Sequence, residues 1–525
     1  MTDPRTMKTP GVYIAEQNAF PSSVVQVPTA EPAFIGYTEK AEARGKSLRC
    51  QPTRITSLAE FESLFGAGPG DDCVGFRLDP AGSAPAVNPD QPLAMRDAEA
   101  FLIDQTPYRL TQTRGFYWLY ACMRQFFENG GWVCHVVSVG SYRNDEGIRI
   151  DAAELAAGLA SLDKQPQVTL VVVPEAVLLP RAECHTLQRA MLAHCGALKN
   201  RFAILDLPEG YRPIADCIAP FRSALGTGHL DFGAAYYPWL HTTILEPQGL
   251  SHACLDADSR KVLIDCVKDE FAGPGTPPAT LAEVDKIGTL VVTPEMDAEA
   301  AAARQEEIAA LAKTLNSLSR RYAAFIEALA RRRNLLPPAA ALAGIYTLVD
   351  NSRGVWHAPA NLSVTGAVSP AVEISDEAQQ DLNVDPTGKS VNAIRSFPGM
   401  GTMVWGARTL DGNSLDWRYV PLRRTVIMLE ESIRLALKAY VFEANVGNTW
   451  VTIRQMLQNF LTTLWKQGGL SGAAPEEAFA VSVGLGETMT AQDILEGTLR
   501  VTVMVALTRP AEFFEMTFEQ TMQTA

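Results

Sequence analysis

Hydrophobic and polar residues alternate strictly over residues 498–508, near the end of the chain. The side chains that share one face are Leu499, Val501, Val503, Val505 and Leu507. A period of two over eleven residues predicts a core strand with one well-buried face. Pro510 ends this strand, because proline cannot donate a hydrogen bond to a sheet.

A second, shorter alternation follows the proline, with Phe514, Met516 and Phe518 on one side. Chain ends usually fray unless something binds them, so an apolar row here is informative. We interpret residues 511–520 as an arm that completes a sheet. The spacing leaves open an ordinary hairpin partner within the same domain.

Continuous apolar runs alternate with helical patterns through the first half of the chain. The runs lie at residues 33–37, 132–139, 168–173 and 202–205, and the helical patterns at residues 115–129, 152–162 and 182–199. Strands that are apolar on both faces and separated by helices predict a mainly parallel α/β sheet covered on both sides. A short helix is also expected over residues 57–66, with Ser57 as N-cap and Gly66 as the stop.

The pattern changes along the rest of the chain. Residues 66–92 are rich in glycine, proline and aspartate and predict a loop or small insertion, and residues 295–333 predict one long helix. Two further helices are expected at residues 425–444 and from Asn448 to Gly468. The predicted organisation is an N-terminal arm (1–28), an α/β domain (29–244), an insertion with a long helix (245–336), a return to the α/β domain (337–400), a C-terminal α+β domain (401–510) and a C-terminal arm (511–525).

Composition narrows the class of protein. The chain has 525 residues and a net charge of −14, from 45 basic and 59 acidic residues, which argues against coating nucleic acid. The sequence contains neither an apolar run of bilayer length nor an N-terminal apolar signal segment. The nine cysteines form no Cys-x-x-Cys pair, which is typical of reduced thiols in a protein made in the cytoplasm.

Catalytic motifs are incomplete. Gly388-Lys389-Ser390 resembles the end of a phosphate-binding loop, but Asn383 stands where the opening glycine would be. Ser471 lies in a partial nucleophile elbow that follows a helix rather than a strand. An α/β hydrolase would also need a histidine after Ser471, and the last histidine is His357. We therefore expect no catalytic residues, no metal site and no cofactor.

Several motifs resemble the contractile tail sheath family of phages and related injection particles. The matching segments are residues 9–13, 33–37, 236–239, 353–361, 391–394, 404–409, 417–424, 442–445, 464–470 and 509–513. They cover most of the chain except residues 66–100 and 245–336. The family implies an α/β body and a C-terminal domain whose sheet is completed by terminal strands of neighbouring subunits.

The resemblance assigns functions to both chain ends. The exchanged strands would contain Val12, Tyr13, Ile14, Phe513, Phe514, Met516 and Phe518, and residues 22–27, between Pro21 and Pro28, would form a flexible joint. The implied partners are other copies of the chain in hexameric rings and a helical polymer, an inner tube protein, and baseplate and terminal cap proteins. Nucleic acid and direct membrane insertion are not expected. A static capsid or tube subunit is the structural alternative.

The resemblance also places the inner tube against the C-terminal domain. The second C-terminal helix has a strongly one-sided apolar face. We therefore expect its polar residues Arg454, Gln455, Gln458 and Lys466 to face the tube. The protein would be made and assembled in a bacterial cytoplasm, as part of a phage tail or a tail-like particle, and release of that particle from the cell remains open.

Overall fold

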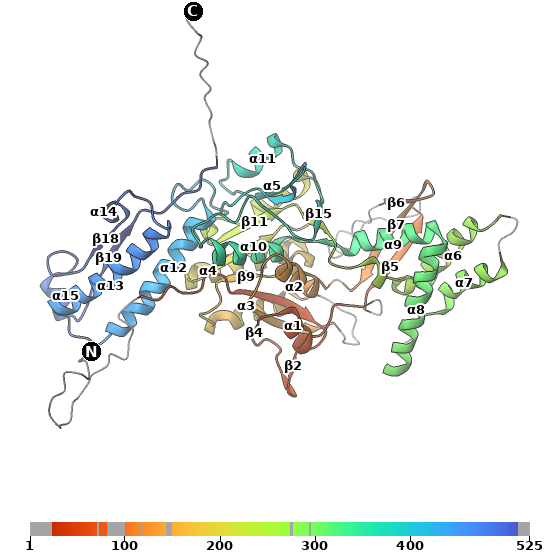
Figure 1. Cartoon of the computed structure of the whole chain (residues 1–525), viewed down its shortest axis with the longest axis horizontal. Coiled ribbons are helices and arrows are strands. Elements are labelled where there is room, and N and C mark those ends of the chain that lie inside the picture. The colour runs from red at the N-terminus through yellow and green to blue at the C-terminus, as the bar shows by residue number, and fades with distance from the viewer. Residues whose placement is uncertain are drawn as a thin grey trace, which may run out of the picture. The chain divides into compact units, whose positions relative to one another are not determined.

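The computed structural model describes residues 24–70, 73–80, 100–115, 117–142, 150–273, 277–292 and 296–512 (Figure 1). The chain divides into two compact units. The first consists of residues 29–424, and the second combines residues 1–28 with 425–525. The division falls inside one helix, α12 (Val420–Leu437), rather than at residue 400 as expected from the sequence.

A nine-stranded sheet forms the centre of the unit 29–424. Its order is β14 (Leu362–Ser363), β17 (Gly401–Val404), β16 (Asn392–Phe397), β11 (Gly233–Tyr237), β10 (Phe202–Asp206), β9 (Leu170–Val172), β1 (Pro32–Thr38), β8 (Cys134–Ser141) and β4 (Thr53–Ile55). From β16 to β8 all neighbours are parallel, and the strands at both edges are antiparallel. The mainly parallel α/β fold is confirmed. Residues 361–400, expected to be connections, supply two of its strands.

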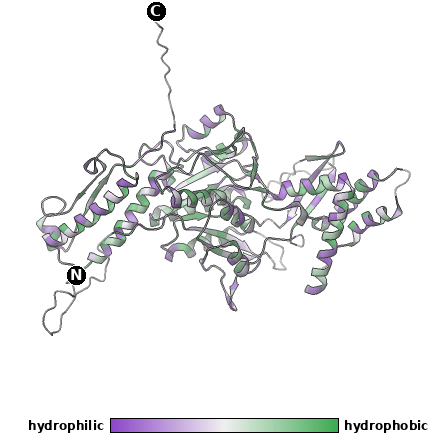
Figure 2. Ribbon diagram, viewed as in Figure 1, coloured by the Kyte–Doolittle hydropathy of each residue, from purple (hydrophilic) through white to green (hydrophobic). Residues whose placement is uncertain are grey.

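Buried helices explain why the strands are apolar on both faces. The helices of this body are α1 (Leu58–Phe65), α2 (Leu119–Glu128), α3 (Ala152–Ala160), α4 (Arg181–Leu198), α5 (Ile214–Ala224), α10 (Ala339–Ser352) and α11 (Asp376–Asn383). Most of α10 is buried, and Figure 2 draws it mostly in the green of hydrophobic residues. Its small alanines let it pack closely against α2 and the strands β9 and β10. The predicted N-cap of α1 is confirmed, since Ser57 Oγ accepts from Glu60 N at 3.2 Å.

Two small sheets accompany the main one. A hairpin joins β2 (Glu42–Ala43) to β3 (Lys46–Ser47), and a three-stranded sheet has the order β13 (Leu335–Leu336), β12 (Leu240–Thr242), β15 (Ala367–Pro370). The latter ties β12, which follows β11, to β13, directly after residues 250–333, and to β15, which comes after α10.

Two distant segments build a second hydrophobic core, which we call the satellite subdomain (residues 73–80, 100–114 and 250–333). Its sheet has the order β5 (Gly75–Pro80), β7 (Thr106–Arg114), β6 (Ala100–Ile103), and its helices are α6 (Ala257–Glu270), α7 (Pro278–Thr289), α8 (Ala298–Leu318) and α9 (Arg320–Arg333). Phe76 and Leu78 pack in one cluster with Tyr322 and Phe325. The expected loop at 66–92 therefore contains a core strand.

The single long helix expected at 295–333 is wrong. Ser319 separates α8 from α9, and its hydroxyl accepts from Tyr322 N at 3.0 Å as the N-cap of α9. The same hydroxyl donates to Glu270 Oε2 at 2.5 Å, and this contact fixes the break against α6. Serine competes well for backbone hydrogen bonds, which is why it suits helix starts.

The second unit contains most of α12, then α13 (Gly447–Lys466), α14 (Pro475–Ala478), β18 (Phe479–Ser482), α15 (Ala491–Leu495) and β19 (Thr502–Val505). The core strand expected over 498–508 is wrong in extent and burial, because β19 has four residues and none of them is buried. The described part of the expected flexible joint is also held. Val24 is buried, and Val27 N donates to Ser432 Oγ of α12 at 3.0 Å.

Candidate assembly interface

The sheet of the second unit has only two strands in the described part of the chain. β18 pairs with β19 in antiparallel register, from Phe479 opposite Val505 to Ser482 opposite Thr502. Isolated two-stranded sheets are marginal in water and usually need a helix or further strands. Here α13 supplies the helix and covers one face, while neither edge of the sheet is paired with a further strand from the described residues.

The hydrogen-bond direction shows which groups occupy the open edge of β19. Ala506 N donates to Ala478 O at 2.8 Å, on the side of β18. Because these directions alternate along a strand, Thr502 and Met504 also face β18, whereas Val503 and Val505 direct N–H and C=O to the outer edge. Such a row of backbone groups is a template for pairing with another chain.

The covered face is fixed by α13. The buried residues of this helix are Ile453, Met456, Leu457, Leu461 and Leu464. Val483 and Leu470 are buried in the same unit. Leu470 forms a bridge with Leu507, and Ser471 N donates to Ala506 O at 2.8 Å, so the chain after β19 is held as well. These contacts fix the position at which the chain leaves β19 and continues into residues 508–512.

Large apolar side chains are exposed throughout this unit. Among the described residues they are Val25, Leu435, Val441, Phe442, Val446, Val451, Leu485, Leu495 and Met504. Phe442 is fully exposed and has a φ of 75°, a conformation that bulky residues rarely adopt. Single exposed apolar residues are normal on protein surfaces, so among these Phe442 stands out by its complete exposure and its backbone conformation.

The loop that carries Phe442 is rigidly held. Trp450 Nε1 donates to Asn445 Oδ1 at 2.6 Å, and Asn445 Nδ2 donates to Thr498 O at 3.1 Å. These bonds hold Asn445, three residues after Phe442, at the end of the same loop. We did not expect this residue from hydrophobic patterning, and its only signal in the sequence was its place in the 442–445 segment of the family resemblance.

The expected tube-facing residues separate into two groups. Gln455, Gln458 and Lys466 are exposed on the side of α13 away from its buried residues. Arg454 is partly buried at the flank of that face, where it donates to Val483 O at 2.7 Å and to Glu487 Oε2 at 2.6 Å. Arg454 thus holds the loop after β18, and the tube contact of all four residues stays a prediction.

The residues assigned to exchanged strands lie outside the described residues. They are Val12, Tyr13, Ile14, Phe513, Phe514, Met516 and Phe518. Their pairing in an assembly therefore remains a prediction that rests on the sequence and on the open edges of β18 and β19.

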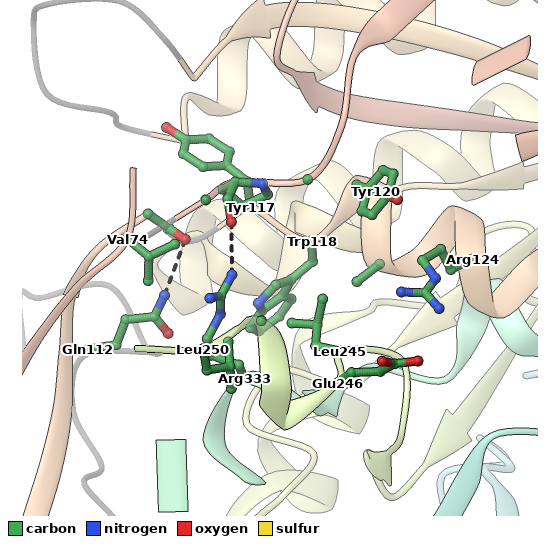
Figure 3. Close-up of a pocket in the computed structure, with 16 residues that line it drawn as sticks. Val74, Gln112, Tyr117, Trp118, Tyr120, Arg124, Leu245, Glu246, Leu250 and Arg333 are labelled. Carbon is green, nitrogen blue, oxygen red and sulfur yellow. Dashed lines mark hydrogen bonds between the residues drawn. The ribbon is translucent and has the colours of Figure 1, made fainter. Parts of the chain in front are cut away.

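A pocket of about 400 Å³ lies in the other unit, where the satellite subdomain meets the α/β body (Figure 3). Trp118, Tyr120 and Leu250 form much of its wall, and Arg333 reaches across to donate to Pro69 O at 2.8 Å. Its lining residues include no histidine, cysteine or serine, so they offer no Ser–His or Cys–His pair. We interpret it as an imperfect junction between two cores.

Neither metal nor membrane chemistry is indicated in the described ranges. No group of three or more histidine, cysteine, aspartate or glutamate side chains there could hold a metal ion. Among the described helices, none combines the length and apolar character needed to cross a bilayer.

Comparisons with known proteins agree with the geometry. Residues 413–521 match the family model of the phage tail sheath C-terminal domain. The chain is similar to the sheath of an extracellular contractile injection system, PVC, in its contracted state, with 25% identity over 98% of both chains and a TM-score of 0.56. It is also similar to the contracted helical sheath of the anti-feeding prophage, AFP, with 25% identity over 98% of this chain and 100% of that chain, and a TM-score of 0.58.

A chain in the six-fold symmetrised AFP baseplate is likewise similar, with 25% identity over 98% of this chain and 100% of that chain, and a TM-score of 0.55. No curated protein sequence matches the chain. The comparisons agree with the family expected from the sequence motifs: residues 413–521 match the tail sheath C-terminal domain, and the chain is similar to contractile injection system sheaths over almost its whole length.

Proposed function

We propose that this protein is the structural subunit of a contractile sheath. It polymerises as stacked hexameric rings around an inner tube and contracts to drive that tube through a target envelope. The observation that carries the proposal is the two-stranded sheet β18–β19, whose outer edges offer backbone groups to strands from neighbouring copies. The likeness to PVC and AFP sheaths in the contracted state supports contraction over a static tube.

Strand addition would link the copies while their bodies move. An added strand of four to six residues forms about four backbone hydrogen bonds at roughly 1 kcal/mol net each. Buried side chains such as Phe514 and Phe518 would add about 1.5–3 kcal/mol each. The six-fold symmetry of the AFP baseplate supports rings of six, and its chain's likeness supports a baseplate as partner. Inner tube and terminal cap proteins complete the proposed set.

Contraction in this proposal needs no nucleotide or catalytic group. The extended sheath is held kinetically by its contacts with tube and baseplate, above a contracted state that buries more surface between subunits. A small difference in free energy between the extended and contracted states of each subunit, summed over many copies, then supplies the work of driving the tube. We propose a structural and not an enzymatic role, which the likeness to sheath proteins supports.

The test is a proline at the outer edge of β19. Val505→Pro removes an N–H that faces outward and leaves the β18–β19 bonds in place. Val505→Thr is the matched control, since it keeps the N–H and a β-branched shape. Both proteins should give the same circular dichroism and monomer size. Electron microscopy should then show sheaths of two lengths for the threonine variant and none for the proline variant.

Two results would count against the proposal. Normal cylinders from Val505→Pro would mean that the β19 edge accepts no strand. Cylinders of a single length from the unmodified protein, under every condition that releases the baseplate, would favour the static tube.

A further inference from the structure

The chain passes between the two units twice. One crossing is at Pro28–Thr29 and the other at Arg424–Thr425. The two crossings are 395 residues apart in the sequence, yet Arg424 Nη2 donates to the backbone oxygen of Thr29 at 2.9 Å. Both crossings therefore leave the unit 29–424 from one place on it.

A buried ion pair joins these two crossings to the body. Arg424 Nη1 and Nη2 donate to Asp350 Oδ1 and Oδ2 at 2.9 and 2.5 Å, a bidentate arrangement. Thr29 Oγ1 donates to Asp350 Oδ2 at 2.6 Å. The side chains of Arg424 and Asp350 are only 4% and 1% exposed, so water screens the pair very little.

The ion pair is anchored in a buried part of the body. Asp350 belongs to α10, the buried helix packed against the parallel sheet. The Arg424 guanidinium also lies over the ring of Tyr346 of α10, 4.8 Å from its centre. Tyr346 Oη in turn lies 2.8 Å from Tyr236 Oη of β11, so the contacts continue into the central sheet.

The neighbouring residue is immobilised as well. The Arg423 guanidinium lies 3.8 Å from the ring centre of Phe232 and 4.6 Å from that of Trp417, with Asp231 at 3.4 Å. On the other side of the boundary, within the second unit, Val27 N donates to Ser432 Oγ at 3.0 Å. Residues 27–29 therefore run beside α12 on both sides of the division.

We infer that Arg424, Asp350 and Thr29 form a mechanical clasp that makes the two crossings resist an applied force together. A pull on the second unit is delivered through both crossings to α10 and the parallel sheet, and neither crossing yields alone. The inference rests on the proposed function for its use in the sheath, where linked neighbours pull on that second unit. The clasp itself is a property of the single chain and can be tested without any assembly.

Hydrogen exchange of the full-length monomer, followed by mass spectrometry, provides the test. Asp350→Asn should speed exchange in peptides covering both 24–32 and 420–432, by about tenfold, because both crossings lose their shared partner. Asp385→Asn is the matched control, since it breaks another largely buried pair, with Arg222 at 3.3 Å, away from the crossings. It should leave both peptides unchanged.

Milder variants keep the test decisive if Asp350→Asn does not fold. Thr29→Val removes one of the bonds to Asp350 and should loosen both peptides less than Asp350→Asn does, and Arg424→Lys, which keeps the charge but loses the bidentate contact, should also loosen both peptides. Faster exchange at one crossing only in Arg424→Lys, or a uniform increase over the whole body, would overturn the clasp. Sheath formation by the unmodified protein is scored separately, so a failed sheath assay does not affect this result.

Discussion

Strands β1 and β19 show how differently one chain treats its two main sheets. All seven residues of β1 are buried, and the strand has a parallel neighbour on each side. The four residues of β19 are exposed or half-buried, and β18 is its one strand neighbour within the described part of the chain. The first sheet has nine strands from within the chain, whereas the second has two in the described part and, in our proposal, gains strands from neighbouring copies.

The largest expected effect lies in the finished sheet. Phe34→Ala removes a buried ring whose centre lies 5.0 Å from that of Phe126. We expect the free energy of unfolding to fall by about 3–5 kcal/mol, because the cavity cannot be refilled. Urea denaturation of the monomer measures this loss, and an effect below about 1 kcal/mol would show that β1 is not a core strand.

Buried carboxyls in the same body predict a pH dependence. Burial raises the pKa of Glu175 to about 7, although its carboxylate accepts from the backbone N–H groups of Tyr37, Trp118 and Leu119. Burial likewise raises the pKa of Asp206 to about 8. The folded protein thus holds a proton that the unfolded chain releases near pH 4.5. The protonated Glu175 therefore contributes its whole stabilisation below pH 4.5. This stabilisation, roughly 3 kcal/mol of unfolding free energy, is lost as the pH rises through about 7.

Urea midpoints between pH 4 and 8 check this sign. The stability of the unmodified chain should fall over that range, and Glu175→Gln should reduce the slope even though it also loses a hydrogen bond. A slope that is unchanged in Glu175→Gln would mean that the carboxylate stays charged throughout. The effect belongs to the body and contrasts with the second unit, where Thr490 lowers the pKa of Asp493 by hydrogen bonding.

A smaller effect is expected for the open sheet in the monomer. Val503→Ala removes a half-buried side chain from β19, so the unfolding free energy should fall by no more than about 1 kcal/mol. Sheath formation should suffer more, since the same side chain would be covered when a neighbouring strand adds. A loss as large as that of Phe34→Ala would remove the contrast between the two sheets.

The smallest effect is expected on the exposed side of α13. Lys466→Glu should leave the monomer's stability within about 0.5 kcal/mol and reduce the yield of tube-filled particles, if this side meets the tube. Arg454→Glu is a poor test, because it also breaks the contacts with Glu487 and Val483. Lys466→Arg is the matched control. A normal particle yield from Lys466→Glu would refute the contact.

Local signals predicted the body well. The apolar runs around Phe34, Val171 and Ile204 are parallel strands in the structure. They could be predicted because a strand that is covered on both faces is recognised from its own continuous apolar sequence. The satellite subdomain could not be predicted this way. Phe76 is separated from Tyr322 by more than 240 positions in the sequence, and neither residue's surroundings indicate the other.

The candidate interface was predicted in outline only. The alternation around Val503 correctly indicated a strand, but a period of two does not say whether its apolar face is covered within the chain or by a neighbour. For Arg454 the helical period indicated the polar side of α13, while its bond to Glu487 depends on a loop that folds back from residues 483–489.

The satellite subdomain is built from two segments that are distant in the sequence, and this limits how the protein can be shortened or fused to other domains. Deleting residues 250–333 alone would expose Phe76 and Leu78 to solvent and leave an aggregation-prone apolar surface. Deleting the β5–β7 segment alone would expose Tyr322 and Phe325 in the same way. A deletion that keeps the rest of the fold intact, or a replacement by a foreign domain, therefore has to remove both segments together, which requires four junctions in the sequence.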